Sequence, residues 1–382
     1  MSQPKRVVLI AGEASGDLLG ANLMQTLKSN HPFIEFYGVG GDRMLEEGLQ
    51  PFFPMSDINL MGVIEILCQL PRVFKRLKET VQQIESLKPD VVVTIDAQGF
   101  SLRLQKRLKK INILGVHYVS PTVWAWRAHR AKVLAANTDQ ILCLYPFEPN
   151  YFIREGGRAS FVGHPIIGQG IEKGDGKVFR EKYSISQSQK IVSVLPGSRG
   201  FEIQSLTPLF KKVAEELCET NSDLHFVVPT LPYRVKTLKS LLEGWKVPHT
   251  IVDSTEDKYA AFNASIFSMA ASGTIALELA AAGVPTIIAY KVNALTAFIL
   301  RRMVDTPFAC MINILNQKLV VPELLQENCT VKTIKQEALH LLESKEAREH
   351  QKKYMRKAID LLTVAKKAPG EKAAEVISGY LN

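Results

Sequence analysis

Residues 7–20 read VVLIAGEASGDLLG, and this stretch decides the fold. An apolar run of β-forming residues ends at a glycine, small and polar residues follow, and an amphipathic helix pattern then begins. This order predicts a buried strand, a tight loop and a helix, which together form the opening unit of a doubly wound α/β sheet. The loop GEASGD lacks the G-x-G-x-x-G spacing of a dinucleotide-binding turn, and no acidic residue ends a clear strand about 20 positions later.

Two interpretations of this loop remain open. Glu13 stands two residues after the buried strand, where packing alone gives little reason for a glutamate. We therefore expect Glu13 and Ser15 to line a ligand-binding cleft. In the alternative interpretation the loop is only a tight strand–helix turn, with Ser15 or Asp17 as the cap of the helix.

The alternation of strand and helix patterns continues along most of the chain. Several strand candidates are apolar at consecutive positions, as in strands that are buried on both faces of a parallel sheet. We expect strands at 7–12, 36–40, 90–96, 111–119, 140–146, 191–197, 224–230, 249–253, 264–270 and 284–290. The pattern predicts an α/β protein with doubly wound parallel sheets.

The alternation of strands and helices occurs in two similar halves, which the Gly-rich, charged stretch GQGIEKGDGK separates. Each half opens with a strand, a glycine loop and a helix. We predict two Rossmann-like domains, residues 1–167 and 168–361, with a C-terminal helix at about 362–382 that packs back on the first domain. Ligands in such sheets bind beyond the carboxyl ends of the strands. Functional residues are therefore expected in those loops, facing a cleft between the domains.

Composition narrows the class of protein. The chain has 382 residues, of which 46% are hydrophobic, and its five cysteines are scattered without metal-ligand spacing. No apolar run reaches the roughly 18–20 residues of a membrane-spanning helix, and the N-terminus shows no export signal. These features favour a cytosolic protein with reduced thiols and without a structural zinc or other metal.

The charge of the chain is strongly basic. The net charge is +9 and the pI is about 9.2, which favours acidic partners such as nucleic acid, anionic lipid or a phosphorylated substrate. Residues 97–138 contain basic residues and no Asp or Glu. A solvated helix face explains this stretch equally well.

Two loops of the first half carry candidate functional residues. The strand at 90–96 ends in DVVVTIDAQGF, which places Asp96 at the carboxyl end of a central strand. Burial there raises a carboxyl pKa toward neutrality, so Asp96 is a candidate general base; the alternative is an N-cap of the next helix. HYVSPTVWAWR then places His117, Trp124 and Arg127 after the following strand. His117 and the indoles could equally be core residues.

Two loops of the second half suit a nucleotide. LPGSRGFEI leads into a helix start, where backbone N–H groups at Gly197 and Ser198 could bind a phosphate and Arg199 adds a charged fork. In SMAASGTIALELAAAGVP the small residues allow close backbone approach to a phosphate. Glu278, about one turn into the next helix, could accept hydrogen bonds from two ribose hydroxyls.

The combination of GEASGD, NLMGVIEIL, TIDAQGF, HYVSPTVWAWR, LPGSR, ASGTIALE and VPELLQ resembles the lipid-A-disaccharide synthase family. The resemblance runs from about residue 6 to the end of the chain. It implies a GT-B glycosyltransferase that uses neither a catalytic metal nor a cofactor. The implied donor is UDP-2,3-diacylglucosamine and the acceptor is 2,3-diacylglucosamine 1-phosphate (lipid X). The products would be a tetraacyl disaccharide 1-phosphate and UDP, formed by inverting transfer in bacterial lipopolysaccharide synthesis.

The resemblance also implies roles for single residues. Asp96 matches the base that deprotonates the acceptor, Glu13 and Ser15 would face the reacting sugar, and Arg199 would neutralise the departing diphosphate. The implied nucleotide site consists of Gly197, Ser198, Arg199, Ser272, Gly273, Thr274, Glu278 and Asn313. Further cleft residues would be Met61, Glu65, His117, Trp124, Arg127, Glu323 and Gln326.

Because the implied substrates are lipids, a membrane contact is expected. The segment 59–78, NLMGVIEILCQLPRVFKRLK, combines an apolar face with basic residues, as in helices that lie in the interface of an anionic membrane. The expected contacts are Leu67, Leu70, Arg72, Val73, Phe74, Lys75 and Arg76. They predict a cytoplasmic protein bound peripherally to the inner membrane. The alternative is a core helix with a basic outer face.

Other functions remain as alternatives. One is another GT-B enzyme acting on substrates of the UDP-N-acetylglucosamine type, either a lipid-linked glycosyltransferase or a UDP-sugar epimerase. A nucleic-acid-binding protein is disfavoured because the chain shows no recognition module and no aromatic residues among the lysines of 103–110. A sugar-nucleotide sensor without catalysis is disfavoured by the presence of both Asp96 and Arg199. Oligomeric state and acyl-chain length leave no signal in the sequence.

Overall fold

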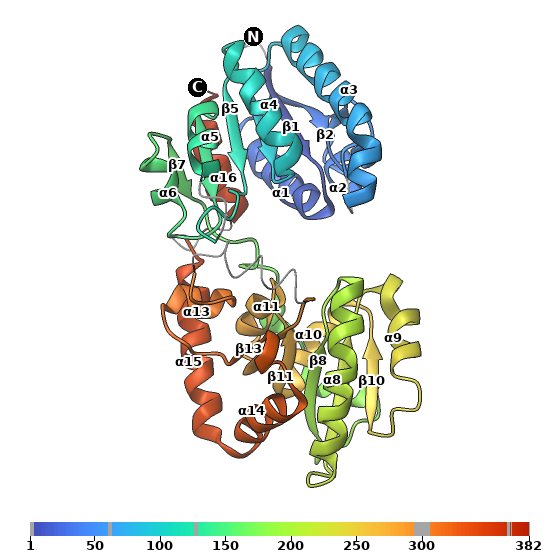
Figure 1. Cartoon of the computed structure of the whole chain (residues 1–382). Coiled ribbons are helices and arrows are strands. Elements are labelled where there is room, and N and C mark those ends of the chain that lie inside the picture. The colour runs from blue at the N-terminus through green and yellow to red at the C-terminus, as the bar shows by residue number, and fades with distance from the viewer. Residues whose placement is uncertain are drawn as a thin grey trace. The chain divides into compact units, whose positions relative to one another are not determined.

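The chain forms two compact units (Figure 1). Unit 1 consists of residues 1–165 and 362–382, and unit 2 of residues 166–361. The computed structural model describes residues 4–59, 63–125, 129–293, 306–364, 367 and 369–381, without the side chains of 63–69 and 369.

Unit 1 is a seven-stranded parallel sheet in the order β3-β2-β1-β4-β5-β6-β7. Its strands are β1 (Lys5–Ala11), β2 (Ile34–Val39), β3 (Gln50–Pro51), β4 (Val91–Ile95), β5 (Gly115–Tyr118), β6 (Gln140–Cys143) and β7 (Ala159–Phe161). Its helices are α1 (Ala14–Asn30), α2 (Asp42–Glu46), α3 (Val63–Leu87), α4 (Gln98–Lys110), α5 (His129–Asn137), α6 (Pro149–Ile153) and α16 (Pro369–Ser378). Apolar residues of β1 and β4 face α1 and α16 on one side and α3 and α4 on the other.

Unit 2 is a six-stranded parallel sheet in the order β10-β9-β8-β11-β12-β13. Its strands are β8 (Lys190–Leu195), β9 (Leu224–Pro229), β10 (His249–Val252), β11 (Ser265–Ala271), β12 (Thr286–Tyr290) and β13 (Glu323–Leu325). Its helices are α7 (Gly176–Lys182), α8 (Gly200–Cys218), α9 (Val235–Leu241), α10 (Thr255–Ala264), α11 (Ile275–Ala281), α13 (Met311–Asn316), α14 (Val331–Glu343) and α15 (Lys345–Leu361).

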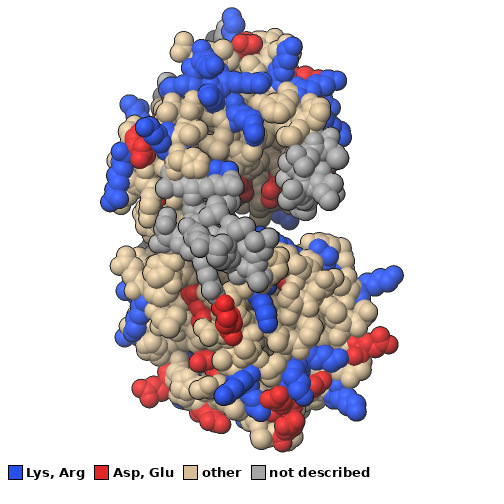
Figure 2. Space-filling view, viewed as in Figure 1, with Lys and Arg blue, Asp and Glu red and all other residues tan. Residues whose placement is uncertain are grey.

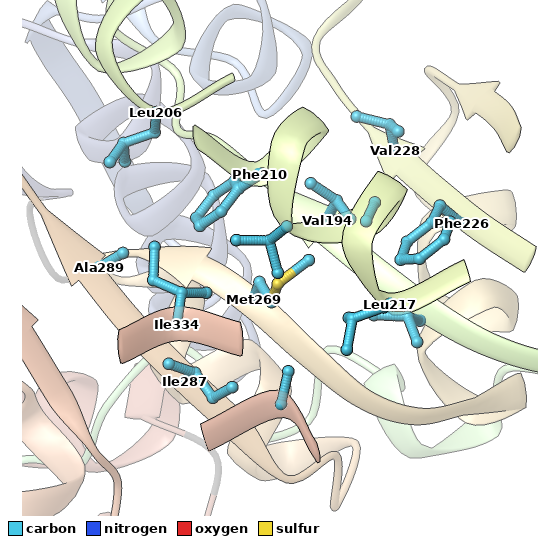
Figure 3. Close-up of a cluster of buried hydrophobic side chains, with 14 of the residues drawn as sticks. Val194, Leu206, Phe210, Leu217, Phe226, Val228, Met269, Ile287, Ala289 and Ile334 are labelled. Atoms are coloured by element: carbon cyan, nitrogen blue, oxygen red, sulfur yellow. The ribbon is translucent and has the colours of Figure 1, made fainter. Parts of the chain in front are cut away.

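The core of unit 2 explains why its strands are apolar on consecutive positions. Phe210 and Leu217 of α8 lie against Val194 and Met269 of the sheet, and Ile334 of α14 covers the neighbouring strands (Figure 3). The opposite face is covered by α7 and α10. Because both faces are buried, no alternation of apolar and polar residues is needed along the strands.

Each sheet has one point where the order of its strands reverses. The central strand β1 lies between β2 and β4, and the central strand β8 lies between β9 and β11. The loops that leave β1 and β4, and likewise β8 and β11, run to opposite faces and leave a crevice at the carboxyl ends of the strands. These two switch points carry GEASGD with IDAQ in unit 1, and LPGSR with ASGT in unit 2.

The prediction of doubly wound parallel sheets is confirmed, and a strand is present within or around each of the ten expected segments. The strand expected at 111–119 begins only at Gly115, because a turn with a positive φ of 54° at Asn112 follows α4. Three short edge strands, β3, β7 and β13, were not expected from the sequence. Each has only two or three residues, too few for a periodic pattern to be recognised.

Basic side chains are unevenly distributed. Figure 2 shows Lys and Arg side chains gathered around α4 in unit 1, whose last turn carries Arg107, Lys109 and Lys110. None of the helices in the described part of the chain has the length and hydropathy required to cross a bilayer.

Candidate functional site

Gly12 allows two loops to lie together at the switch point of unit 1. A Cβ atom added to Gly12 would lie only 2.7 Å from the Cβ atom of Ala97. Gly12 therefore lets the loop after β1 lie against the loop after β4. Glu13, the next residue, is the N-cap of α1, has an exposed side chain and makes no side-chain cap hydrogen bond. The loop thus presents a carboxylate beside the residues that follow β4.

Asp17 has a structural role in this loop. Its buried carboxylate accepts hydrogen bonds from the N–H groups of Gly41, Arg43 and Met44 at 2.8, 3.2 and 3.1 Å. Asp17 therefore caps α2. The alternative interpretation, in which Ser15 or Asp17 caps α1, is wrong, because Glu13 occupies that position and Ser15 is exposed in the first turn.

Asp96 stands in an unusual backbone conformation directly after β4. Asp96 has φ of 48° and Ala97 has φ of 44°, and such left-handed values are costly for residues with a Cβ atom. The Asp96 N–H donates to the carbonyl oxygen of Tyr118 at 2.9 Å, and the Ser101 hydroxyl donates to the carbonyl oxygen of Asp96 at 2.7 Å. The next helix has Ala97 as its N-cap, so the alternative of Asp96 as the N-cap residue does not hold.

The surroundings of the Asp96 carboxyl suit proton transfer. Burial raises its pKa to about 6, the charge of Glu13 adds to the rise, and the Ala97 N–H opposes it. A carboxyl with this pKa is ionised at neutral pH and still holds a proton well enough to accept one from a substrate. Asp96 can therefore act as a base at the switch point of unit 1.

His117 lies in the core of unit 1. Its side chain is fully buried in β5, its Nδ1 atom is 2.8 Å from the hydroxyl of Thr94, and Gln105 donates to the same hydroxyl at 2.9 Å. Burial lowers the pKa of His117 to about 4, so the ring is neutral at physiological pH. The burial of His117 favours the core alternative over the expected cleft role.

A buried acid at the end of β6 was missed by the sequence analysis. The Glu148 carboxylate accepts hydrogen bonds from the N–H groups of Leu144 and Tyr145, both at 3.0 Å, and from the indole of Trp124 at 3.2 Å. Burial raises the pKa of Glu148 to about 7, although these hydrogen bonds oppose the rise. Trp124 also packs edge-on against Phe147. The available signal was YPFEP, an acid among aromatic residues directly after a buried strand.

The switch point of unit 2 contains a pocket with a volume of about 360 Å³, which is within the range of about 300–1,000 Å³ that small-molecule sites occupy. It is lined by Leu195, Gly197, Ser198, Arg199, Glu202, Pro229, Thr230, Leu231, Lys258, Ala271, Ser272, Gly273, Thr274, Ile275 and Glu278. Of the residues expected to bind a nucleotide, Asn313 is the one outside this set. The loops after β8 and β11 thus form one pocket with the end of β9.

Glu202 fixes the LPGSR loop, a role that the sequence did not reveal. Its buried carboxylate accepts the N–H groups of Ser198 and Arg199, each at 3.1 Å, and lies 3.1 Å from the Arg199 guanidinium. Gly197 has φ of 109°, and a Cβ atom there would collide with this carboxylate. Glu202 therefore occupies the Ser198 amide, one of the two that we expected to bind a phosphate, together with the Arg199 amide. The Arg199 side chain is 68% exposed and remains accessible to a ligand.

Asn313 is a structural residue in unit 2. Its side chain is fully buried; it accepts the N–H groups of Val320 and Val321 and donates to Glu323 at 2.6 Å. Glu323 in turn accepts the N–H groups of Ala309 and Cys310, at the start of α13. The expectation of a direct nucleotide contact by Asn313 is therefore wrong, because its amide is saturated within the protein.

Gln326 has an intramolecular contact as well. Its side-chain oxygen accepts the N–H of Val292, just beyond β12, at 3.3 Å. Gln326 itself has a positive φ of 53°. Through Gln326 and Glu323, the VPELLQ motif at the edge of the sheet thus holds the segment after β12 and the segment before α13.

The candidate membrane segment is partly buried. Val73 is only 7% exposed and packs with Leu77 on the core face of α3, so its expected membrane contact is wrong. Arg76 is held by the buried Asp57, its Nε atom 2.8 Å from that carboxylate, and Arg72 also pairs with Asp57. Phe74 is 46% exposed.

Lys75 is exposed on α3, and Leu70 is half-buried. The side chains of Met61, Glu65, Leu67 and Arg127, which were named above, lie outside the described residues.

The comparisons with known proteins agree over nearly the whole chain. The family model "Lipid-A-disaccharide synthetase" matches residues 7–377. The lipid-A-disaccharide synthase of Gluconobacter oxydans is 41% identical over 374 residues, 98% of this chain and 90% of that protein. The enzyme of the same name from Idiomarina loihiensis is 35% identical and covers 100% of this chain and 99% of its own length.

Solved structures show the fold. A Staphylococcus aureus MnaA–UDP structure superposes with a TM-score of 0.67 at 15% identity, covering 99% of this chain and 97% of that one. Acinetobacter baumannii MurG gives a TM-score of 0.61 at 14% identity, with 98% and 100% covered. The two doubly wound units are thus of the GT-B kind. Together with the sequence relatives, this result shows that the chain belongs to the lipid-A-disaccharide synthase family, the glycosyltransferases of lipid A biosynthesis.

Proposed function

We propose that the chain transfers 2,3-diacylglucosamine from UDP-2,3-diacylglucosamine to 2,3-diacylglucosamine 1-phosphate, with inversion at the anomeric carbon. The observation that carries the proposal is the chemical contrast between the two switch points. Unit 2 offers a pocket with small residues, an exposed arginine and a glutamate, which suits a nucleoside diphosphate. Unit 1 offers the half-buried base Asp96 beside Glu13. Membership of the family supports lipid A precursors as the substrates.

In the proposed reaction, Asp96 accepts the proton of the acceptor's primary hydroxyl. The hydroxyl oxygen attacks the anomeric carbon from the face opposite the diphosphate, and the bond to UDP breaks as the diphosphate takes the electron pair. Arg199 stabilises the charge that develops on the leaving group, a task that a metal ion performs in other transferases. Glu13 and Ser15 lie on the loop that would face the reacting sugar. The proposal assigns no step to a metal or cofactor.

The nucleotide is proposed to bind in unit 2. Gly273 has φ of 154° and no neighbouring atom within 4 Å of an added Cβ, so the Ser272–Thr274 loop can approach a diphosphate closely. Glu278 is proposed to accept the ribose hydroxyls. Asn313 and Glu323 would act indirectly, by positioning the loop at 309–310 whose Ala309 carbonyl oxygen lies 3.5 Å from the Ser272 hydroxyl.

We further propose that the chain works on the cytoplasmic face of the inner membrane and binds anionic lipid through the outer face of α3. Phe74 is exposed there, with the Arg103 guanidinium 5.7 Å from its ring centre. We expect Phe74→Ser to weaken co-sedimentation with vesicles that contain anionic lipid. Phe33→Ser is the matched control, because Phe33 is 73% exposed outside α3. Equal losses for both variants would contradict this docking surface.

The test of the transfer reaction is UDP release from UDP-2,3-diacylglucosamine in detergent micelles, with and without the acceptor, in the presence of EDTA. We expect release that requires the acceptor, survives EDTA and yields a disaccharide phosphate by mass. If UDP binds but no acceptor-dependent release occurs, the proposed reaction fails, and other UDP-sugar reactions such as epimerisation come into question.

A further inference from the structure

Lys258 lies in the pocket of unit 2 opposite the carboxylate that is proposed to bind ribose. It is on α10, and its Nζ atom is 2.6 Å from Oε2 of Glu278 on α11. The two side chains are only 25% and 20% exposed, respectively, and both residues line the pocket. Nothing in the sequence pattern singled out Lys258, because the two residues are far apart in the chain.

The ion pair leaves the two oxygens of Glu278 in different situations. Oε2 is engaged by the Lys258 ammonium. Oε2 is buried and has no hydrogen-bond partner among the described residues, so Lys258 holds it through charge alone, and the ion pair does not involve Oε1. The Lys258 ammonium also lies 4.9 Å from the ring centre of its neighbour Tyr259, a second interaction that restricts its position. The carboxylate is thus anchored at one oxygen and available to a ligand at the other.

We propose that Lys258 is a positioning residue that orients Glu278 to accept hydrogen bonds from the ribose hydroxyls of the nucleotide. A carboxylate free to rotate would lose conformational entropy on binding, and anchoring one oxygen removes that cost in advance. A site organised to accept hydrogen bonds from a hydroxyl also discriminates against an analogue that lacks it, because the buried acceptor is then left unpaired. Lys258 therefore sets the preference for ribose over deoxyribose. This inference rests on the proposed binding of UDP in unit 2.

The experiment compares the binding of UDP, 2′-deoxy-UDP, uridine and UMP to the full chain by calorimetry. For the wild type we expect UDP to bind on the order of tenfold or more tightly than 2′-deoxy-UDP, as hydrogen bonds to a charged group imply. In Lys258→Met this preference should largely disappear. Relative to the wild type, the affinity of Lys258→Met should fall by a similar factor for uridine, UMP and UDP, because the ribose is common to all three.

The matched control is Lys182→Met. Lys182 binds Asp257, the residue before Lys258 on the same helix, at 2.8 Å from both carboxylate oxygens, but does not line the pocket. This variant should keep the ribose preference of the wild type. The double variant Lys258→Met/Glu278→Gln should lose no more ribose preference than Glu278→Gln alone, since both act on one contact.

The outcomes separate this inference from the proposed function. If the wild type binds no UDP, the proposed nucleotide site itself fails. If the wild type binds UDP and Lys258→Met keeps the preference for ribose, the positioning role is wrong. The positioning role would also be wrong if the loss of affinity in Lys258→Met grew from uridine to UMP to UDP, because Lys258 would then act on the phosphates.

Discussion

Asp96 combines three features that are each unfavourable for a folded protein. Its backbone is left-handed, its carboxyl is partly buried, and the acid Glu13 is nearby. Such strain and charge persist where the surrounding structure enforces them, and they are concentrated at functional sites. At the residue scale, Asp96 is therefore the part of unit 1 that is most directly explained by chemistry rather than by packing.

Asp96→Asn should abolish transfer and leave UDP binding in unit 2 unchanged, because only the base is altered. In the wild type, kcat/KM should fall about tenfold per pH unit below the Asp96 pKa of about 6, since the base must be ionised to accept a proton. The measurement is acceptor-dependent UDP release between pH 4.5 and 8. Turnover retained by the variant would remove Asp96 from this role.

The same substitution should make unit 1 more stable at neutral pH. The pKa of Asp96 in the folded chain, about 6, lies above its ordinary value of 3.8. Its contribution to stability is therefore complete at low pH and is lost as the pH rises through 6. Asp96→Asn removes this loss, which is worth about 3 kcal/mol at pH 7. Urea unfolding at pH 4 and 7.5 should show the gain at the higher pH; equal gains at both values would contradict the assigned cause.

Arg199→Ala should weaken UDP binding by about tenfold or more, as expected for a charge-assisted contact to phosphate. Uridine should bind as it does to the wild type, because Glu202 holds the loop through the backbone N–H groups of Ser198 and Arg199, which the substitution retains. Calorimetry with both ligands makes the comparison. Unchanged UDP affinity would mean that other groups hold the diphosphate.

At the scale of elements, Gly12 and Gly197 act on neighbouring strands and loops rather than on a ligand. Gly12 allows the loop after β1 to approach Ala97 after β4, and Gly197 makes room for the Glu202 carboxylate at the start of α8. These contacts determine where each loop presents its functional side chains.

Gly12→Ala should separate the loops after β1 and β4, because the new methyl would lie 2.7 Å from the Cβ atom of Ala97. Overpacking of this kind costs about 1–3 kcal/mol of stability, and the displacement of Glu13 and Asp96 should lower kcat more than it raises KM. Gly99→Ala is the control, since its Cβ would have no neighbour closer than 3.9 Å. A variant at Gly12 with wild-type kcat would show that the loops tolerate this shift.

At the scale of the whole molecule, the end of the chain completes the unit in which the chain began. After α15 in unit 2, the chain returns to unit 1, where Ala373, Ala374 and Ile377 of α16 join the core beside α1. His31 lies 2.9 Å from the hydroxyl of Ser378, and Tyr380 donates to Gln140 at 3.2 Å.

Truncation after Leu361 should therefore destabilise unit 1 selectively. Loss of the buried Ile377 and Leu381 alone should cost on the order of 4 kcal/mol. UDP should still shift the thermal unfolding of unit 2, which keeps its whole sheet. Ile377→Ala should show a smaller effect in the same direction, about 2–4 kcal/mol. A truncated chain whose unit 2 no longer responds to UDP would contradict the assignment of residues 362–382 to unit 1.

The sequence alone was sufficient for the features that depend on consecutive residues. Apolar runs located the long strands, and the rule that ligands bind beyond the carboxyl ends of strands pointed to the loops that carry Asp96 and Arg199. The motifs also identified the family. These signals are local, because the hydrophobic period and the turn residues of an element lie within a few positions of one another.

Only the tertiary structure decided which side chains are free to act. It placed His117, Asn313 and Val73 in the core, although each stands in a promising motif. It also revealed partners that are distant in sequence, such as Lys258 for Glu278. The physical reason is that burial and side-chain pairing depend on which elements pack together. A strand–loop pattern states where a residue is in the chain but not which groups surround it once the sheets are covered.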